Sequence, residues 1–515
     1  MFGFSYLRIG DLQWGMSESK LDTLWREISD LTATEAVLGW DQETMMPPKG
    51  QAARGNALGT LAGIKHAKMT SAEILESAEA CAEMAAEDSV AEAKAREALR
   101  QIHRARKIPA DLAKALAEST SSGLASWQKA RASSDFSLFA QDLETLVRLN
   151  QEKASALSPD GPAYDALLDE FEPGATEAVL GPLFDSLRAD LSPLIQAVSD
   201  SGVVVDESPA QGDFSEKAQA IFGKMVAQKM GYDFEAGRLD LAAHPFCPGF
   251  SPSDVRITWR YQTDDFRPAL FGIMHEAGHG LYEQGLNPAW VGTSIGGAVG
   301  LGMHESQSRM WENLIGRSRA FWEWALPEFR AAFPGKSEVT VDQMFPALHT
   351  AKASLIRVEA DEATYNLHVA ARFEIERRLF SGKISVADLP EFWNQTYEDL
   401  LGIRADNVSE GVLQDIHWSM GAFGYFPTYT LGNLINAQLF ETIEQEIHDL
   451  DAQMAQGDFH AIREWLRAKI HAQSSRYSSD QLVEKVTGSP LSADAFLAGI
   501  RKVTAEVYGI SENNM

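Results

Sequence analysis

Residues 273–285 read IMHEAGHGLYEQG, and this stretch sets two histidines one helical turn apart, with a glutamate directly after the first. Glycines flank the second histidine, at Gly278 and Gly280. Each glycine costs a helix interior roughly 1 kcal/mol relative to alanine, so a helix that serves packing alone gains nothing from the pair. We therefore expect another part of the protein to approach His279 closely.

The flanking residues predict that this stretch lies on one helix. Residues 263–265 (Thr, Asp, Asp) are possible N-caps, Pro268 stands in an early turn where its missing N–H is tolerated, and Gly285 and Pro288 end the pattern.

Two histidines four positions apart share one face of a helix. His275 and His279 can therefore direct imidazole nitrogens at one metal ion. Glu276 is rotated by about 100° from His275, so its carboxylate flanks the ion and can take a proton from an activated water. The pattern H-E-x-x-H is the signature of zinc metallopeptidases.

A catalytic zinc takes three protein ligands and keeps one open position. Glu305, 26 positions after His279 at the start of a second predicted helix, is the expected third ligand. This His-His-Glu set is thermolysin-like, because the third histidine of an extended metzincin motif is absent. His304 is the competing ligand, although its side chain points about 100° away from that of Glu305. Glu305 could also pair with Arg309, four positions later.

Composition narrows the class of protein. The 515 residues carry a formal charge of −28, which argues against a nucleic-acid partner, and 45% of them are hydrophobic. Cys81 and Cys247 form neither a disulfide framework nor a thiolate metal site. The first residues do not form a signal peptide and no long apolar run occurs, so we expect a soluble cytoplasmic protein with no membrane partner.

Along the chain, helical periodicity runs from Ser17 to about Ser199, broken at 46–50, 108–112, 158–162 and 172–176. The segment from about residue 200 to 215 is the best linker candidate. Asp254 to Tyr261, DVRITWRY, alternates like a half-buried strand and predicts, with residues 237–246, a small sheet just before the H-E-x-x-H helix. Residues 1–15, upstream of Met16, are a probable extension outside the fold.

Several motifs in a fixed order carry a resemblance that spans nearly the whole chain. The sequence resembles the carboxypeptidase Taq family, peptidase family M32. The matching motifs are VLGWDQETMMPP (37–48), HPF (244–246), DVRIT (254–258), HEAGH (275–279), HESQ (304–307), IRVEAD (356–361) and GVLQDIHW (411–418).

The resemblance implies a mainly α, saddle-like metallopeptidase fold with a deep active-site groove. It also implies metal-dependent carboxypeptidase activity of broad specificity, usually in a homodimer. By the same resemblance His275, His279 and Glu305 are the ligands and Glu276 is the general base. Residues 16–512 then form a single peptidase unit, with a helical N-terminal part (16–200) and a catalytic part (216–512).

A carboxypeptidase must recognise a free α-carboxylate, for which a guanidinium is the natural partner. Arg357 in IRVEAD is the expected anchor, on a helix predicted from Ala351 to Arg378. The competing interpretation is that Arg357 forms an ion pair with Asp361 on that helix. Arg256, which alternates out of the apolar strand face, is the second candidate.

The oxygen that becomes negative during peptide hydrolysis needs a hydrogen-bond donor besides the metal. His417, Tyr425 and Tyr429 are the candidates. We further expect that Asp361 or Asp415 could orient a ligand histidine, that His244 could line the groove, and that the edge of strand 254–261 could pair with the substrate backbone.

The prediction is a metallocarboxypeptidase that acts on peptides with a free C-terminus. Zn²⁺ is the default ion, although His₂Glu sites also accept Co²⁺ or Mn²⁺. The alternatives are a helical zinc oligopeptidase that cleaves internal bonds and a metal-binding scaffold without turnover; the intact Glu276 argues against the second.

Overall fold

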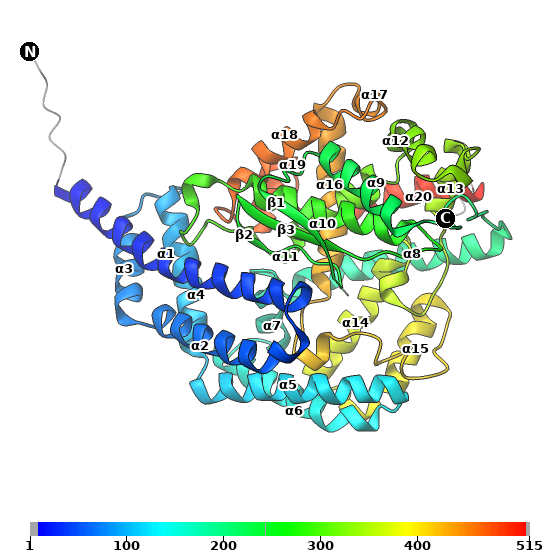
Figure 1. Cartoon of the computed structure of the whole chain (residues 1–515). Helices are drawn as coiled ribbons and strands as arrows, with labels where there is room; N and C mark the ends of the chain where they lie inside the picture. Colours follow the sequence, from blue (N-terminus) through cyan, green and yellow to red (C-terminus); the bar gives the residue numbers. More distant parts are fainter. Residues whose placement is uncertain (1–8, 243, 511–515) are drawn as a thin grey trace, which may run out of the picture.

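Helices make up most of the described part of this protein, together with one three-stranded sheet (Figure 1). The structure is a computed structural model that describes residues 9–242 and 244–510. The prediction of a mainly helical fold with a small sheet beside the H-E-x-x-H helix is confirmed. None of the helices in the described ranges combines the length and the apolar character needed to cross a membrane.

The N-terminal part is a series of helices that break at the four predicted places and also at residues 70–71, 85–89 and 134–136, which were not predicted. They are α1 (Ile9–Thr44), α2 (Gln51–Met69), α3 (Ala72–Met84), α4 (Val90–Lys107), α5 (Ala110–Ser133), α6 (Ser137–Leu157), α7 (Ala163–Phe171) and α8 (Glu177–Ser201). Helix α1 begins earlier than the expected start at Ser17, because residues 9–16 contain no proline to interrupt it. Residues 1–8 of the predicted extension lie outside the described residues.

Helices α1, α3 and α4 enclose an apolar cluster of their own. Its buried members are Leu21, Trp25, Ile28, Ile74, Ala78, Cys81, Ala91, Ala95, Ala98 and Ile102. The main hydrophobic core runs from Trp127 to Tyr508 and shares none of these residues. Helices α1, α3 and α4 therefore have an apolar core of their own, whereas α5 to α8 belong to the main core.

The predicted linker is a packed connection between α8 and α9 (Glu216–Met230). Ala210 and Phe214 are fully buried in the main core, and Gln211 forms a β-bridge with Asp265 just before the H-E-x-x-H helix. Residues on both sides of this segment thus contribute to one core.

The sheet contains β1 (Gly237–Leu241), β2 (Gly249–Ser251) and β3 (Asp254–Trp259) in the order β1-β3-β2. Strand β3 pairs in parallel with β1 and antiparallel with β2. Val255 and Ile257 face the core as the alternation predicted. The hypothesis that the edge of this strand binds the substrate backbone is wrong, because β3 is the central strand and both of its edges are already paired.

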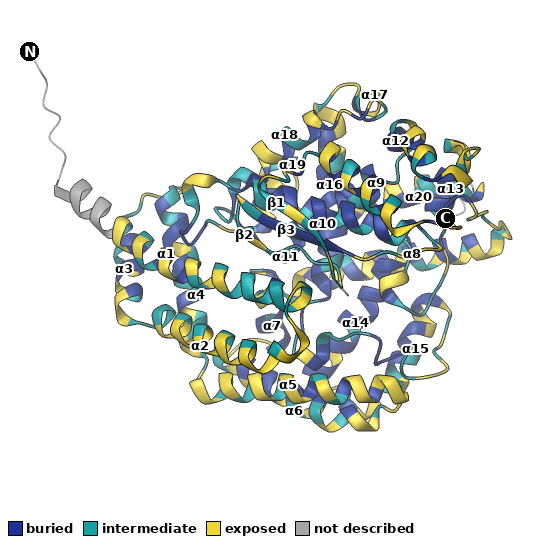
Figure 2. Cartoon of the chain, in the orientation of Figure 1, coloured by how far each residue is buried: buried dark blue, intermediate teal, exposed yellow. Residues whose placement is uncertain are grey.

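Three helices at the centre carry or support the candidate site, and most of their residues are buried (Figure 2). They are α10 (Arg267–Gly285), α11 (Leu301–Arg309) and α16 (Pro427–Glu446). A π-helical turn, Met310–Ile315, continues α11. The other helices are α12 (Arg319–Ala332), α13 (Val341–Leu348), α14 (Tyr365–Phe380), α15 (Leu389–Leu401), α17 (Leu450–Met454), α18 (His460–Lys469), α19 (Ser479–Thr487) and α20 (Asp494–Tyr508).

The helix predicted from Ala351 to Arg378 is wrong in its first half. Helix α14 starts at Tyr365, and a short 3₁₀ turn, Arg357–Glu359, precedes it. The Asp361 carboxylate accepts the backbone N–H groups of Lys352, Ala363 and Thr364. This side chain offers the backbone an alternative to helical hydrogen bonds, which the periodicity of the sequence does not reveal.

A cleft of about 920 Å³ opens between the N-terminal helices and the catalytic part. Residues of α1, α2 and α4 line one side. Residues 249–252, the glycine-rich segment 291–300 and Glu283 line the other.

Candidate metal centre

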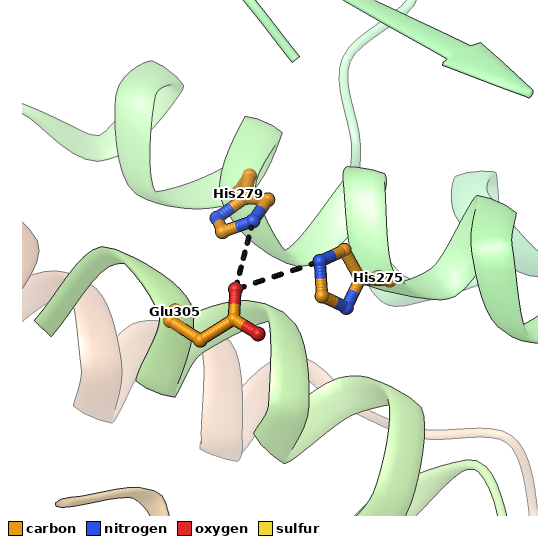
Figure 3. A group of neighbouring side chains, drawn as sticks. All are labelled: His275, His279 and Glu305. Carbon is orange, nitrogen blue, oxygen red and sulfur yellow. Dashed lines mark ion pairs between the residues drawn. The ribbon is translucent and has the colours of Figure 1, made fainter. Parts of the chain in front are cut away.

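The structure brings together the three ligands predicted from the sequence. His275 and His279 on α10 point toward Glu305 on α11 (Figure 3). One possible ligand atom from each residue lies within 4.8 Å of the others. The Oε2 atom of Glu305 is 3.6 Å from Nε2 of His275 and 3.5 Å from Nε2 of His279.

Two separations within this donor set fit a tetrahedral metal ion. Ligands about 2.0–2.1 Å from one ion in tetrahedral geometry stand about 3.3–3.4 Å apart. The two separations from Glu305 Oε2 are close to that value. Two imidazole nitrogens and one carboxylate oxygen are also the ligands of the His₂Glu zinc peptidases.

The second ring nitrogen of each histidine already has a partner. Nδ1 of His275 is 2.8 Å from Oε2 of Glu312, which stands in the π-helical turn after α11. Nδ1 of His279 is 2.6 Å from Nδ1 of His304. Both rings therefore present Nε2 to the shared point. His304, the competing candidate ligand, instead contacts the His279 ring on the side away from that point.

Glu305 is held so that one of its oxygens faces the histidines. Arg309 donates from Nε to Oε1 at 2.7 Å, and Ser308 donates its hydroxyl to Oε2 at 3.1 Å. Burial would raise the pKa of Glu305, but His275 and Arg309 hold it well below its ordinary value. The predicted Arg309 pair thus exists together with the ligand geometry and does not replace it.

The glycines of the opening stretch explain how the helices come this close. A Cβ at Gly278 would lie 2.7 Å from the Gln307 carbonyl oxygen and 2.7 Å from Cα of Ser308, both in the backbone of α11. A Cβ at Gly280 would lie 2.6 Å from the ring of Tyr232. On α16, a Cβ at Gly432 would lie 2.5 Å from Cγ of Glu305. The expected close approach is therefore that of α11, which carries the third candidate ligand, at Gly278, and that of the Tyr232 ring at Gly280.

Glu276 lies beside this group and is 6% exposed. Burial raises the pKa of its carboxyl to about 7, while the neighbouring His275 counteracts part of the shift. A carboxylate with a pKa near neutrality can both accept and release a proton at neutral pH.

Arg357 lies deep in the protein, 4% exposed, on the 3₁₀ turn. Its Nη2 donates to Asp415 at 2.8 Å and its Nη1 donates to the Tyr365 hydroxyl at 2.8 Å. The expected competing pair with Asp361 is wrong, because Asp415 is the partner. Asp415 also accepts from Nε of Arg372 at 2.6 Å, so two guanidinium groups share one carboxylate.

The three candidate donors for the negative oxygen lie together. Nε2 of His417 is 3.3 Å from the Tyr429 hydroxyl, and the rings of Tyr425 and Tyr429 are 5.4 Å apart between centroids. Burial, and then the charge of Glu305, raises the pKa of Tyr425. Burial lowers the pKa of His417 to about 3, so its imidazole is neutral.

The remaining candidates lie in other surroundings. Arg256 forms a two-bond pair with Asp254, at 2.9 Å for each bond, and its guanidinium stacks 4.3 Å from the Trp40 ring of α1. His244 is exposed, between β1 and β2. The prediction that Asp361 or Asp415 orients a ligand histidine is wrong, because those carboxylates bind backbone N–H groups and arginines.

Sequence reasoning missed Glu312 and Glu283, which contact the rings around the candidate ligands. Glu283 Oε1 is 2.9 Å from Nε2 of His304. Helical spacing could have suggested both residues, since Glu283 stands four positions after His279 and Glu312 seven positions after Glu305.

The comparisons with known proteins agree with this geometry. The family model described as carboxypeptidase Taq (M32) metallopeptidase matches residues 20–503. A thermostable carboxypeptidase 1 of Thermus thermophilus is 44% identical over 94% of this chain and 97% of its own length. Carboxypeptidase 1 of Bacillus subtilis is 38% identical over 92% of this chain and 95% of its own length.

The fold is similar to that of solved members. The crystal structure of an M32 carboxypeptidase from Deinococcus radiodurans superposes with a TM-score of 0.92 at 38% identity, and the match covers 97% of this chain and 100% of that one. The chain therefore belongs to the carboxypeptidase Taq (M32) family of metallopeptidases and is a metal-dependent carboxypeptidase.

Proposed function

We propose that the enzyme holds Zn²⁺ between His275, His279 and Glu305 and removes single residues from the C-termini of peptides, with Glu276 as the general base. The observation that carries this proposal is that both imidazoles turn Nε2 toward the same oxygen of Glu305, while other groups occupy their Nδ1 atoms.

When bound, the ion would supply Lewis-acid chemistry to the scissile carbonyl and to water. Glu276 takes a proton from the water that attacks the carbonyl carbon. It then gives this proton to the amine nitrogen as the carbon–nitrogen bond breaks. Burial raises the pKa of Glu276, which makes its carboxylate a better proton acceptor than an exposed one.

Arg357 is the proposed anchor for the substrate's α-carboxylate. Arg357 and Arg372 share the single carboxylate of Asp415, so the three groups keep one net positive charge in a buried place. Each terminal nitrogen of a guanidinium carries two hydrogens, and the contacts of Arg357 with Asp415 and Tyr365 use one on each. Within the described part of the chain these two nitrogens make no other hydrogen bond, so we assign their remaining hydrogens to the substrate carboxylate, which would neutralise the charge.

The cluster of His417, Tyr425 and Tyr429 donates hydrogen bonds to the negative carbonyl oxygen in this proposal. The proximity of this cluster to both Glu305 and Arg357 supports the assignment, since the charges of these two residues act on the Tyr429 hydroxyl. His244 remains a predicted lining residue of the groove. Arg256 we assign to packing, because Asp254 and Trp40 already occupy its guanidinium.

Further details of the proposal rest on the sequence. Zn²⁺ is the proposed ion, with Co²⁺ or Mn²⁺ as substitutes. Residues 16–512 form one peptidase unit that acts on peptides of broad sequence as a cytoplasmic homodimer, with no nucleic-acid or membrane partner.

The test compares an N-blocked peptide as its free acid and as its C-terminal amide. We measure release of the terminal residue by the wild type, by Glu276→Gln and by the exposed control Glu235→Gln, each with and without a chelator. We expect release from the free acid alone, abolished by the chelator and reduced by about 10²–10⁴-fold in Glu276→Gln. Internal fragments would contradict the anchoring role of Arg357, and full activity of Glu276→Gln would contradict the base.

A further inference from the structure

The two candidate histidine ligands have different partners on their outer ring nitrogens. His275 meets a carboxylate, that of Glu312, directly. His279 meets a second imidazole, that of His304, and this imidazole in turn meets the carboxylate of Glu283. An imidazole in this place is unusual, since the outer nitrogen of a metal-binding histidine normally donates to a carboxylate, a carbonyl or water.

A single arrangement of protons satisfies this chain of contacts when His279 binds a cation. Its Nε2 must then carry a lone pair, so its Nδ1 carries the hydrogen. Nδ1 of His304, 2.6 Å away, has to accept that hydrogen. The ring of His304 is then protonated on Nε2, which donates to Oε1 of Glu283 over 2.9 Å. Glu283, an acceptor in its ionised form, thereby determines the tautomers of both rings.

The fold holds this arrangement from three sides. His304 stands next to Glu305 on α11, and Glu283 stands one turn after His279 on α10. Strand β2 packs on the Glu283 carboxylate, because a Cβ at Gly249 would lie 2.5 Å from its Oε2. The side chains of His304 and Glu283 are each 18% exposed. The contacts are therefore part of the packed structure and do not belong to a mobile surface pair.

We propose that Glu283 and His304 are positioning residues that fix the orientation and tautomer of His279 and thereby set the affinity for the metal. The inference rests on the proposed metal site. It adds that one ligand is controlled through two residues that do not touch the ion, one of them at the wall of the cleft.

The experiment measures the dissociation constant for Zn²⁺ of the metal-free full-length protein, by competition with a chromophoric chelator. The variants are His304→Phe, which keeps a flat ring but has no acceptor, His304→Gln, whose amide oxygen can accept, and Glu283→Gln. The matched control is His103→Phe, at an exposed position on α4. Circular dichroism checks that each variant is folded, and the visible spectrum of the Co²⁺ form reports the ligand geometry.

We expect His304→Phe to weaken Zn²⁺ binding about 10–100-fold and to change the Co²⁺ spectrum, with partial recovery in His304→Gln and no effect of the control. Glu283→Gln should weaken binding to a smaller extent, and should add little when combined with His304→Phe, because both act through the same hydrogen bonds.

Wild-type affinity in folded His304→Phe and Glu283→Gln would overturn the proposal while leaving the metal site in place. If His304→Phe does not fold, Glu283→Gln alone decides in the same way. Failure of the wild type itself to bind Zn²⁺ would overturn the metal site, and the inference with it.

Discussion

Replacing Gly278 by alanine tests whether the closeness of α10 and α11 determines the geometry of the metal centre. The new Cβ would lie 2.7 Å from the Gln307 carbonyl oxygen and from Cα of Ser308. Both are backbone atoms, so no side-chain rotation relieves the contact. Reaching an ordinary contact of 3.4 Å requires α11 to move by about 0.7 Å, and Glu305 moves with it.

The stability effect is the difference of two terms. Overpacking a tight interface costs about 1–3 kcal/mol, and alanine regains about 1 kcal/mol of helix propensity. We therefore expect the free energy of unfolding of the metal-free protein to fall by at most about 2 kcal/mol. Zn²⁺ binding should weaken more clearly, by at least about tenfold, because ligand placement is sensitive to shifts of this size.

Gly272→Ala provides the matched control on the same helix, since a Cβ at Gly272 meets no atom within 4 Å. It should stabilise the protein by about 1 kcal/mol and leave Zn²⁺ binding unchanged. Urea unfolding gives the stabilities, and competition with a chelator gives the affinities. Equal Zn²⁺ affinity of the two variants would refute the idea that Gly278 is required for the approach of α11.

Three further predictions concern protons and packing. Burial lowers the pKa of His275, but the carboxylates of Glu305 and Glu312 outweigh it and raise the pKa to about 9. Zn²⁺ binding at pH 7.5 should therefore release about one proton from the protein. Calorimetry in buffers of different ionisation enthalpy measures this proton release. Burial raises the pKa of Glu172 to about 7, so the folded state keeps a proton that the unfolded chain loses above pH 4.5. Stability is then full below pH 4.5 and declines by up to about 3 kcal/mol as the pH rises through 7, and urea unfolding of Glu172→Gln should lack this decline. Arg256→Ala should lower the melting temperature, because it removes the contact between β3 and Trp40 of α1. The same substitution should leave the KM for the free-acid peptide unchanged. A large rise in KM would instead show that Arg256 binds the substrate.

The parts of the site that local spacing governs could be predicted from the sequence. Two histidines four positions apart on a helix share one of its faces. The glycines around His279 indicate that another part of the chain packs closely there, although they do not identify it. The strand at 254–259 and the helix breaks that contain proline or glycine followed from periodicity and composition in the same way, whereas the breaks at 70–71, 85–89 and 134–136 contain neither residue.

The missed features depend on contacts between distant residues. Arg357 meets Asp415, 58 positions later, and its segment is non-helical because the Asp361 side chain binds the backbone. Strand order is equally non-local: nothing in DVRITWRY says that both of its edges are covered. The contact of Glu312 with His275 also involves the π-helical turn, which periodicity at 3.6 residues per turn does not anticipate.

The separate apolar cluster of α1, α3 and α4 has a consequence for the local unfolding of the protein. Cooperative units of a protein open with free energies of their own, and amide hydrogen exchange reports each of them. Because this cluster shares no residue with the main core, we expect α1, α3 and α4 to open and exchange their amides at a lower free energy than α10, α11 and α16. Of these helices, α1 and α4 line the 920 Å³ cleft. This side of the cleft and the helices that carry the candidate ligands thus belong to different cores, so we expect this side to move without displacing the candidate ligands.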